Sequence, residues 1–254
     1  MRLMGQLGGL GVAHRLLLLA LGAMFIQQTF AAIGRSLPSV IAPAIMDDLA
    51  VDHAWLGVYV AIAAAASLGF QLGCGSFILR YGALRMSQAA LVMLAIGLVA
   101  AALAGPLWLF VVAAVIGGGG AAVSTPSSSH LLGRYSPPRI APLVFSLKQT
   151  AVPVGLLFSG ILGPWLTGLT DWRGALLAAA AGCLVFTVML QPLRREFDAD
   201  RQPGQRFRMS DFVTTITAVT RERDLRALSI ACFAFNGLQT VFTSYFVTYL
   251  VALG

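Results

Sequence analysis

The chain has 254 residues, of which 58% are hydrophobic and 11% are charged, and its mean hydropathy is +0.83. A soluble globular protein carries about 25% charged residues, so this composition excludes a soluble domain and predicts an all-α integral membrane protein. The formal net charge is +7, but the cations follow the membrane topology described below, and we expect no nucleic-acid partner. The three cysteines are far apart and lack metal-ligand spacing, so we expect neither a metal nor a cofactor.

A membrane-spanning helix needs about 20 mostly apolar residues, and seven stretches qualify. They are Leu16–Ile45, Trp55–Ile78, Met86–Gly105, Leu107–Leu131, Ala141–Leu166, Ala175–Leu193 and Ala227–Leu253. Pro38 and Pro43 interrupt the first stretch. The sequence therefore predicts a six-helix N-terminal bundle over residues 1–193, a polar loop over 194–226 and a seventh membrane helix over 227–254. Within the loop, residues 211–220 are expected to form a short surface helix.

The cations are concentrated in alternate loops, which predicts the orientation of the chain because cytoplasmic loops are enriched in Lys and Arg. With a cytoplasmic N-terminus, the inner segments contain Arg2, Arg15, Arg80, Arg85, Arg134, Arg139 and eight arginines from Arg194 to Arg226. The outer segments contain Asp47, Asp48, Asp52 and Asp171, with Arg173 as the only cation. We expect the loop arginines to lie against anionic lipid. The large excess of Arg over Lys, with abundant Ala and Gly, indicates a GC-rich bacterial genome and hence a bacterial inner membrane.

The connection between the second and third stretches, GSFILRYGALRM (residues 75–86), resembles the signature loop of the major facilitator superfamily. Against the family pattern G-x-L-a-D-r-x-G-r-R/K, Gly75, Arg80 and Gly82 match, and Arg85 stands one place beyond the expected terminal cation. The resemblance implies that these four residues belong to a gating loop. In the family the aspartate of this pattern helps to hold the inward gate, and here Leu79 stands in its place.

The same family is indicated by the order of the segments: six spans, a long basic loop and a further span are the layout of the first half of a two-bundle transporter. RSLPSVIAPAIMDDLAVDHAWLG (residues 35–57) and FSLKQTAVPVG (residues 145–155) are also similar to a bacterial subgroup that includes cyanate and nitroimidazole permeases. The resemblance covers essentially the whole chain. It implies the N-terminal half and seventh helix of a twelve-helix transporter, with the C-terminal half as a possible partner.

Lys148 is the only lysine, and it lies in an apolar stretch nine residues after Arg139. If Arg139 lies at the cytoplasmic interface, Lys148 is about 13 Å deeper at 1.5 Å per residue, roughly halfway through a hydrocarbon core of about 30 Å. A charge at such depth usually faces a bundle interior or a water-filled cavity and marks a functional site. We expect a substrate-binding role for Lys148, with Gln149 beside it. The alternative is that Lys148 lies along lipid and snorkels to the headgroups.

Arg35 is a second cation at membrane depth, because the twelve residues between it and Asp47 correspond to about 18 Å of helix. It can also be read as an interfacial arginine on a long helix. Since the first helix lines the central cavity in major facilitator proteins, the resemblance implies a substrate-binding position. Gln28 on the same helix, and Asn236 and Gln239 on the seventh, are neutral candidates for the same site, although each can equally serve helix packing.

None of the ten acidic residues falls within a predicted span. Two buried cations without a buried carboxylate predict an anionic substrate, although a carboxylate supplied from outside this chain would serve equally well. The leading hypothesis is therefore a secondary transporter that moves a small organic or inorganic anion by alternating access.

The principal alternative is a non-transporting membrane fragment, or a helix-bundle subunit that acts only with a partner. A retinal-type receptor is disfavoured because the seventh helix lacks the lysine that it would need. An enzyme is not expected, because the sequence offers no nucleophile–base pair or metal cluster.

Overall fold

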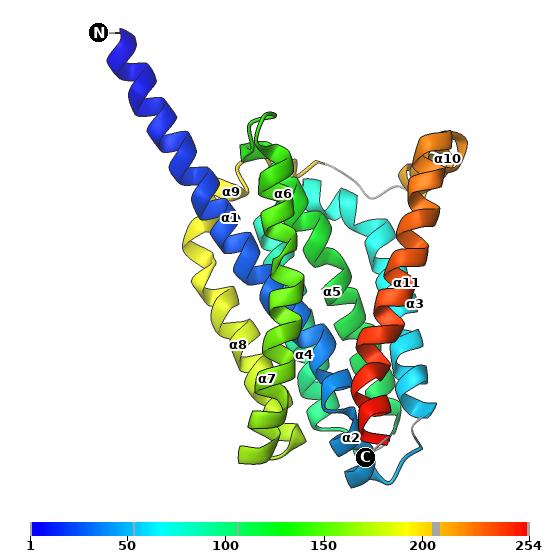
Figure 1. Ribbon diagram of the computed structural model, residues 1–254. Helices are drawn as coiled ribbons and strands as arrows, with labels where there is room; N and C mark the ends of the chain where they lie inside the picture. The colour runs from blue at the N-terminus through cyan, green and yellow to red at the C-terminus, as the bar shows by residue number, and fades with distance from the viewer. Residues whose placement is uncertain (1, 53, 106, 205–208, 253–254) are drawn as a thin grey trace.

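The computed structural model describes residues 2–52, 54–105, 107–204 and 209–252. Figure 1 shows a bundle of long helices lying side by side, with the N-terminal end of the first helix extending beyond the others. The ordered elements of the described residues are all helices, without a strand. The predicted all-α class is confirmed.

Within the described residues, seven helical segments are long and apolar enough to cross a membrane, which agrees with the seven predicted spans. Five of them consist of, or begin with, one long helix: α3 (Ala54–Tyr81), α4 (Ala83–Ala102), α5 (Leu107–Tyr135), α8 (Trp172–Met189) and α11 (Arg223–Ala252). The first span begins at His14 within α1 (Arg2–Val40). The fifth consists of α6 (Ala141–Gln149) and α7 (Ala151–Leu169), and the sixth continues from α8 through the short helices η1 (Gln191–Leu193) and α9 (Arg194–Phe197).

The first predicted stretch forms two helices, because its prolines interrupt the backbone hydrogen bonds. Helix α1 ends at Val40, and α2 (Ala42–Leu49) begins after Ile41. Pro43, in the first turn of α2, has no N–H to donate to the carbonyl of Ser39. The chain therefore changes direction near Ile41, and α2 covers one end of the bundle (Figure 1).

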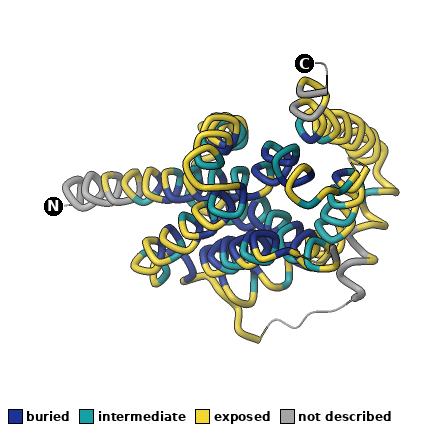
Figure 2. Tube along the Cα trace, turned by 90° about the horizontal axis from the view of Figure 1, so that it is seen from below, coloured by how far each residue is buried: buried dark blue, intermediate teal, exposed yellow. Residues whose placement is uncertain are grey.

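Helices α1 and α4 form the centre of the bundle. Helix α4 packs against α5, α8 and α1, and α1 also packs against α5, α7 and α8. Seen along the bundle, the buried residues gather in the middle, whereas α11 is exposed over most of its length (Figure 2). The main contacts of α11 are with α1, α2 and α10 (Met209–Arg221). The hydroxyl of Tyr245 also reaches α3, where a Cβ atom at Gly57 would lie 2.5 Å from it. Helix α10 contains the predicted surface helix at residues 211–220, and α11 begins at Arg223, four residues before the predicted seventh span.

Helices α1 and α7 approach closely because α7 places a small residue at every fourth position. Four such residues are buried: Ala151, Gly155, Ser159 and Gly163. A Cβ atom at Gly155 would lie 2.5 Å from the Cβ of Ala32 and 2.7 Å from the carbonyl oxygen of Thr29. The hydroxyl oxygens of Ser159 and Ser36 are 2.7 Å apart. Small residues at this spacing allow membrane helices to pack backbone to backbone.

The two ends of the bundle differ in charge. At the end that carries α2, which we call the acidic end, Asp48 accepts hydrogen bonds from Nη1 of Arg173 at 2.7 Å and Nε1 of Trp172 at 3.1 Å. These bonds join α2 to the start of α8. They hold the pKa of Asp48 below its ordinary value, the bond from Arg173 having the largest effect. The opposite end, which carries α9 and the junction of α3 with α4, we call the basic end.

Candidate functional site

Lys148 lies next to a break in the fifth span. Helix α6 ends at Gln149 and α7 begins at Ala151. Pro153 lacks the N–H that would donate to the carbonyl of Gln149, and a proline ring clashes with that carbonyl in a continuous helix. The hydroxyl of Thr150 turns back and donates to the carbonyl of Leu147 at 2.6 Å. Thr150 itself keeps helical angles (φ −65°, ψ −15°), and its N–H donates to the carbonyl of Ser146 at 3.2 Å, so the interruption beside Lys148 is local and the two helices form one span.

The side chain of Lys148 is buried inside the bundle, with 2% of its surface exposed. Its Nζ donates a hydrogen bond to Oγ of Ser129 on α5 at 3.3 Å. Among the described residues no carboxylate forms an ion pair with it. The ammonium group therefore points toward α5 and away from the outer surface of the bundle.

Arg35 lies on α1 and is exposed. Within the part of the chain that the structure describes, its guanidinium has neither an ion pair nor a hydrogen bond. Arg35 follows Gln28 by seven residues, so both lie on one face of α1. Arg35 is therefore a cation within a candidate span that the described contacts leave open to a ligand.

Gln28 is 5% exposed and bridges α1 and α5. Its Nε2 donates to Oγ1 of Thr125 at 3.0 Å, and its Oε1 accepts from Oγ of Ser128 at 3.5 Å. The neighbouring Gln27 donates to Oγ of Ser124 at 3.0 Å. Both glutamine amides thus link the two helices, which is the packing role that the sequence left open for Gln28.

The structure does not place Lys148 and Arg35 at the same depth. Oγ1 of Thr29 on α1 lies 3.4 Å from the carbonyl oxygen of Ala151 on α7, which fixes the register of these two parallel helices. Lys148 is three residues before Ala151, toward the basic end, and Arg35 is six residues after Thr29, toward the acidic end. At 1.5 Å per residue, their Cα atoms differ in depth by about 13 Å.

Among the described residues, none of the remaining neutral candidates forms a hydrogen bond with either cation through its side chain. Gln149, Asn236 and Gln239 are all exposed. The Nδ2 of Asn236 donates to the carbonyl of Cys232 on its own helix at 2.8 Å. The described contacts therefore leave a substrate role for these three residues a hypothesis.

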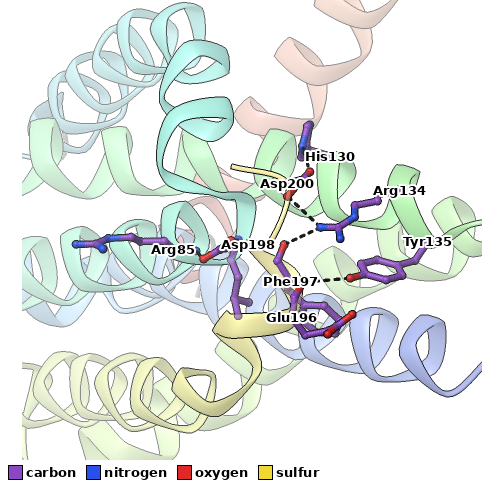
Figure 3. Close-up of polar contacts among 9 residues, drawn as sticks. Arg85, His130, Arg134, Tyr135, Glu196, Phe197, Asp198 and Asp200 are labelled. Atoms are coloured by element: carbon purple, nitrogen blue, oxygen red, sulfur yellow. Dashed lines mark hydrogen bonds and ion pairs between the residues drawn. The ribbon is translucent and has the colours of Figure 1, made fainter. Parts of the chain in front are cut away.

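The predicted gating segment (residues 75–86) contains the end of α3 and the start of α4, joined through Gly82. Gly75, Arg80 and Arg85 are exposed, and the guanidinium of Arg80 lies 5.3 Å from the ring centroid of Tyr81. The amide N–H groups of Leu84 and Arg85 donate to the two carboxylate oxygens of Asp198, at 2.8 Å and 3.1 Å. Figure 3 shows Asp198 beside the start of α4.

The segment that contains Asp198 also binds the basic end of α5 (Figure 3). Asp200 accepts from Nη1 of Arg134 at 3.0 Å, and its second oxygen lies 3.2 Å from Nε2 of His130. Burial raises the pKa of Asp198, and its hydrogen bonds from the backbone of Leu84 and Arg85 partly oppose that rise. Sequence reasoning placed Asp198 in a polar loop and did not identify these contacts.

No group of three His, Cys, Asp or Glu side chains that could hold a metal ion is found among the described residues. The cysteines Cys74, Cys183 and Cys232 are free, and the first two are buried. The described residues therefore contain one network of polar contacts at the basic end and two cations within candidate spans, Lys148 and Arg35. Because α1 ends at Val40, Arg35 lies only five residues from the end of its span, closer than the continuous helix to Asp47 expected from the sequence.

Comparison with known proteins agrees with this architecture. The sequence profile of the Major Facilitator Superfamily matches residues 24–254. No curated protein matches the chain. The profile covers all seven spans except the first turns of the first, including the junction of α3 with α4 and the break beside Lys148. The chain therefore belongs to the major facilitator superfamily, whose members are membrane transporters that bind small-molecule substrates.

Proposed function

We propose that this chain contributes to the transport of a small organic or inorganic anion by alternating access. The observation that carries the proposal is the presence of Arg35 and Lys148 at membrane depth without a carboxylate partner in the described residues. Of the ten acidic residues, only Glu196 and Asp224 fall within the range of a span, each within two residues of its end. An anionic substrate supplies the missing negative charge.

The two cations have different parts in this proposal. A charge at the bilayer centre costs about 2.5–3.5 kcal/mol on insertion scales, and a bound anion offsets that cost. Arg35 is exposed and unpaired, so it is the direct contact for an anion in the described conformation. Lys148 is enclosed against Ser129, so its contact with substrate requires a change at the α6–α7 break. A shift of this short helix is one element of alternating access.

The membrane arrangement is part of the same proposal. The basic end faces the cytoplasm of a bacterium and the acidic end faces outward, in accord with the positive-inside rule. Residues 1–193 act as the N-terminal bundle, residues 194–226 as a cytoplasmic connector, and residues 227–254 as the first helix of a second bundle. The gating role of Gly75, Arg80, Gly82 and Arg85 also belongs to this proposal.

A binding screen with a panel of simple anions tests the proposal. The detergent-purified protein is heated in the presence of sodium acetate, succinate, nitrate or phosphate, and in parallel with chloride salts of amines of similar size. A ligand that binds only the folded state at 100 times its Kd stabilises it by about 2.7 kcal/mol. We expect at least one of the anions, and none of the amines, to raise the Tm.

Arg35→Gln is the matched variant for this screen. A hydrogen bond to a charged group contributes about 1.5–3 kcal/mol, so the variant should weaken binding of the active anion by roughly 10- to 100-fold. Stabilisation by amines instead of anions would contradict the anion proposal. An unchanged concentration dependence in Arg35→Gln would remove Arg35 from the site.

A further inference from the structure

Helix α4 begins at a residue that cannot cap it. The N-terminal N–H groups of a helix have no intrahelical partner, and a side chain at the N-cap normally accepts from the second or third of them. The N-cap of α4 is Gly82, which has no side chain, and its φ of 98° and ψ of 150° are accessible to little other than glycine. The N–H groups of Leu84 and Arg85, the second and third helical residues, therefore need an acceptor from elsewhere.

Asp198 provides that acceptor from a position 114 residues beyond Leu84 in the chain. Its two oxygens accept the N–H groups of Leu84 and Arg85, and 4% of the residue is exposed. A Cβ atom built at Gly82 would collide with the carboxyl group of Asp198. The carboxylate thus fills the space in which the side chain of an N-cap residue would lie.

The segment around Asp198 is fixed to two further helices. We call residues 197–202 the strap. Its Asp200 contacts His130 and Arg134 on α5, and the N–H of Gln202 donates to the carbonyl of Leu79 on α3 at 2.7 Å. The ring of Phe197, 1% exposed, packs edge-on against Tyr135 with centroids 5.4 Å apart. The strap therefore contacts the basic ends of α3, α4 and α5 (Figure 3).

The strap contacts the α3–α4 junction through the backbone groups of the junction. The arginine side chains of the junction are therefore free to contact other groups. Arg80 stacks on its neighbour Tyr81, and Arg85 uses only its backbone N–H toward Asp198. Asp198 forms its ion pair with Arg194 of α9 instead, with Nε of Arg194 3.7 Å from Oδ2 of Asp198. Within the described residues, the guanidinium groups of Arg80 and Arg85 have no acidic partner.

We propose that Asp198 is a positioning residue that caps α4 from outside the α3–α4 junction, so that the strap fixes the segment presenting Arg80 and Arg85. The conformation of the α3–α4 junction then depends on the strap, which follows the sixth span and leads to α10 and α11. The relevance of this dependence to gating rests on the proposed transport function, whereas the capping itself does not.

Hydrogen exchange measured by mass spectrometry, on the purified full chain in lipid nanodiscs, tests the capping directly. In Asp198→Ala the amides of Leu84 and Arg85 should exchange roughly 2- to 30-fold faster, the factor that corresponds to loss of an N-cap. Asp198→Asn retains one acceptor oxygen, and we expect a smaller increase. Asp200→Ala is the matched control, because it removes a strap carboxylate that does not contact α4, and it should leave these two amides unchanged.

The outcomes separate a positioning role from a general effect on stability. Faster exchange that is confined to the start of α4, and is larger in Asp198→Ala than in Asp198→Asn, supports the proposal. Unchanged exchange of Leu84 and Arg85 in Asp198→Ala would overturn it. If Asp198→Ala does not fold, Asp198→Asn provides the test. Leu84 and Arg85 amides that exchange in Asp198→Asn at the wild-type rate would then overturn the proposal. No substrate is present, so a negative anion screen and a negative exchange result are independent.

Discussion

The close contact between α1 and α7 predicts opposite effects for two glycine substitutions on the same helix. Gly155 and Gly160 both lie in the interior of α7. A Cβ atom at Gly155 would lie 2.5 Å from the Cβ of Ala32 and 2.7 Å from a backbone carbonyl, whereas nothing lies within 4 Å of a Cβ at Gly160. Gly155→Ala therefore overpacks the interface, and Gly160→Ala is its matched control.

The expected magnitudes follow from these distances. Alanine is favoured over glycine in a helix by about 0.8–1.0 kcal/mol, so Gly160→Ala should leave stability unchanged or raise it. Carbon atoms pack at about 3.5–4.0 Å, so the helices must separate by roughly 1 Å to admit Gly155→Ala. Overpacking of this kind costs about 1–3 kcal/mol, which exceeds the gain in helix propensity.

Thermal unfolding of the two variants in the same detergent is the assay. For a chain of this size, 1 kcal/mol corresponds to about 2–4 °C in Tm, so Gly155→Ala should unfold several degrees below Gly160→Ala. Equal Tm values, or a higher Tm for Gly155→Ala, would refute the close packing of α1 on α7.

Two further predictions concern charged groups. Lys148→Met should maintain or raise the Tm, because it replaces a buried ammonium by an apolar chain of similar length. Lys148→Ala leaves a cavity and should lower the free energy of unfolding by about 2–5 kcal/mol, and with it the Tm. A lower Tm for the methionine variant than for the alanine variant would contradict the burial of Lys148. Because the pKa of Asp48 is lowered, its pairing with Arg173 stabilises the protein above the ordinary pKa of 3.8 and is lost as the pH falls through the lowered value. Asp48→Asn should therefore have a lower Tm than wild type at neutral pH, with the two values converging in acid, and a difference that persists in acid would count against this ion pair.

The spans and their order could be predicted from the sequence because apolar length alone determines which segments cross a membrane. The interruption near Ile41 was predicted as well, since Pro38 and Pro43 cannot donate backbone hydrogen bonds. The break at Thr150 was not predicted, although Pro153 is its local signal. The fifth stretch is apolar on both sides of the break, and hydropathy does not distinguish one helix from two.

The candidate site shows what depends on tertiary contacts. The depth of Lys148 follows from its distance in sequence from Arg139, but its partner Ser129 belongs to another span. Asp198 could be assigned only to a polar loop. Its contact with Leu84 joins residues 114 positions apart, and no local pattern at Gly82 indicates which carboxylate will cap α4.

The measurement that tests the central claim most directly is charge movement by the purified protein in liposomes on a solid-supported membrane. The panel of acetate, succinate, nitrate and phosphate is applied as concentration jumps, with amine chlorides as controls. The anion proposal predicts a transient current for at least one of the anions over the chloride background, none for the amines, and loss of the anion current in Lys148→Met, which is expected to stay folded. Currents from the amines, or a full anion current in Lys148→Met, would contradict the assignment of Lys148 and Arg35 to an anionic substrate.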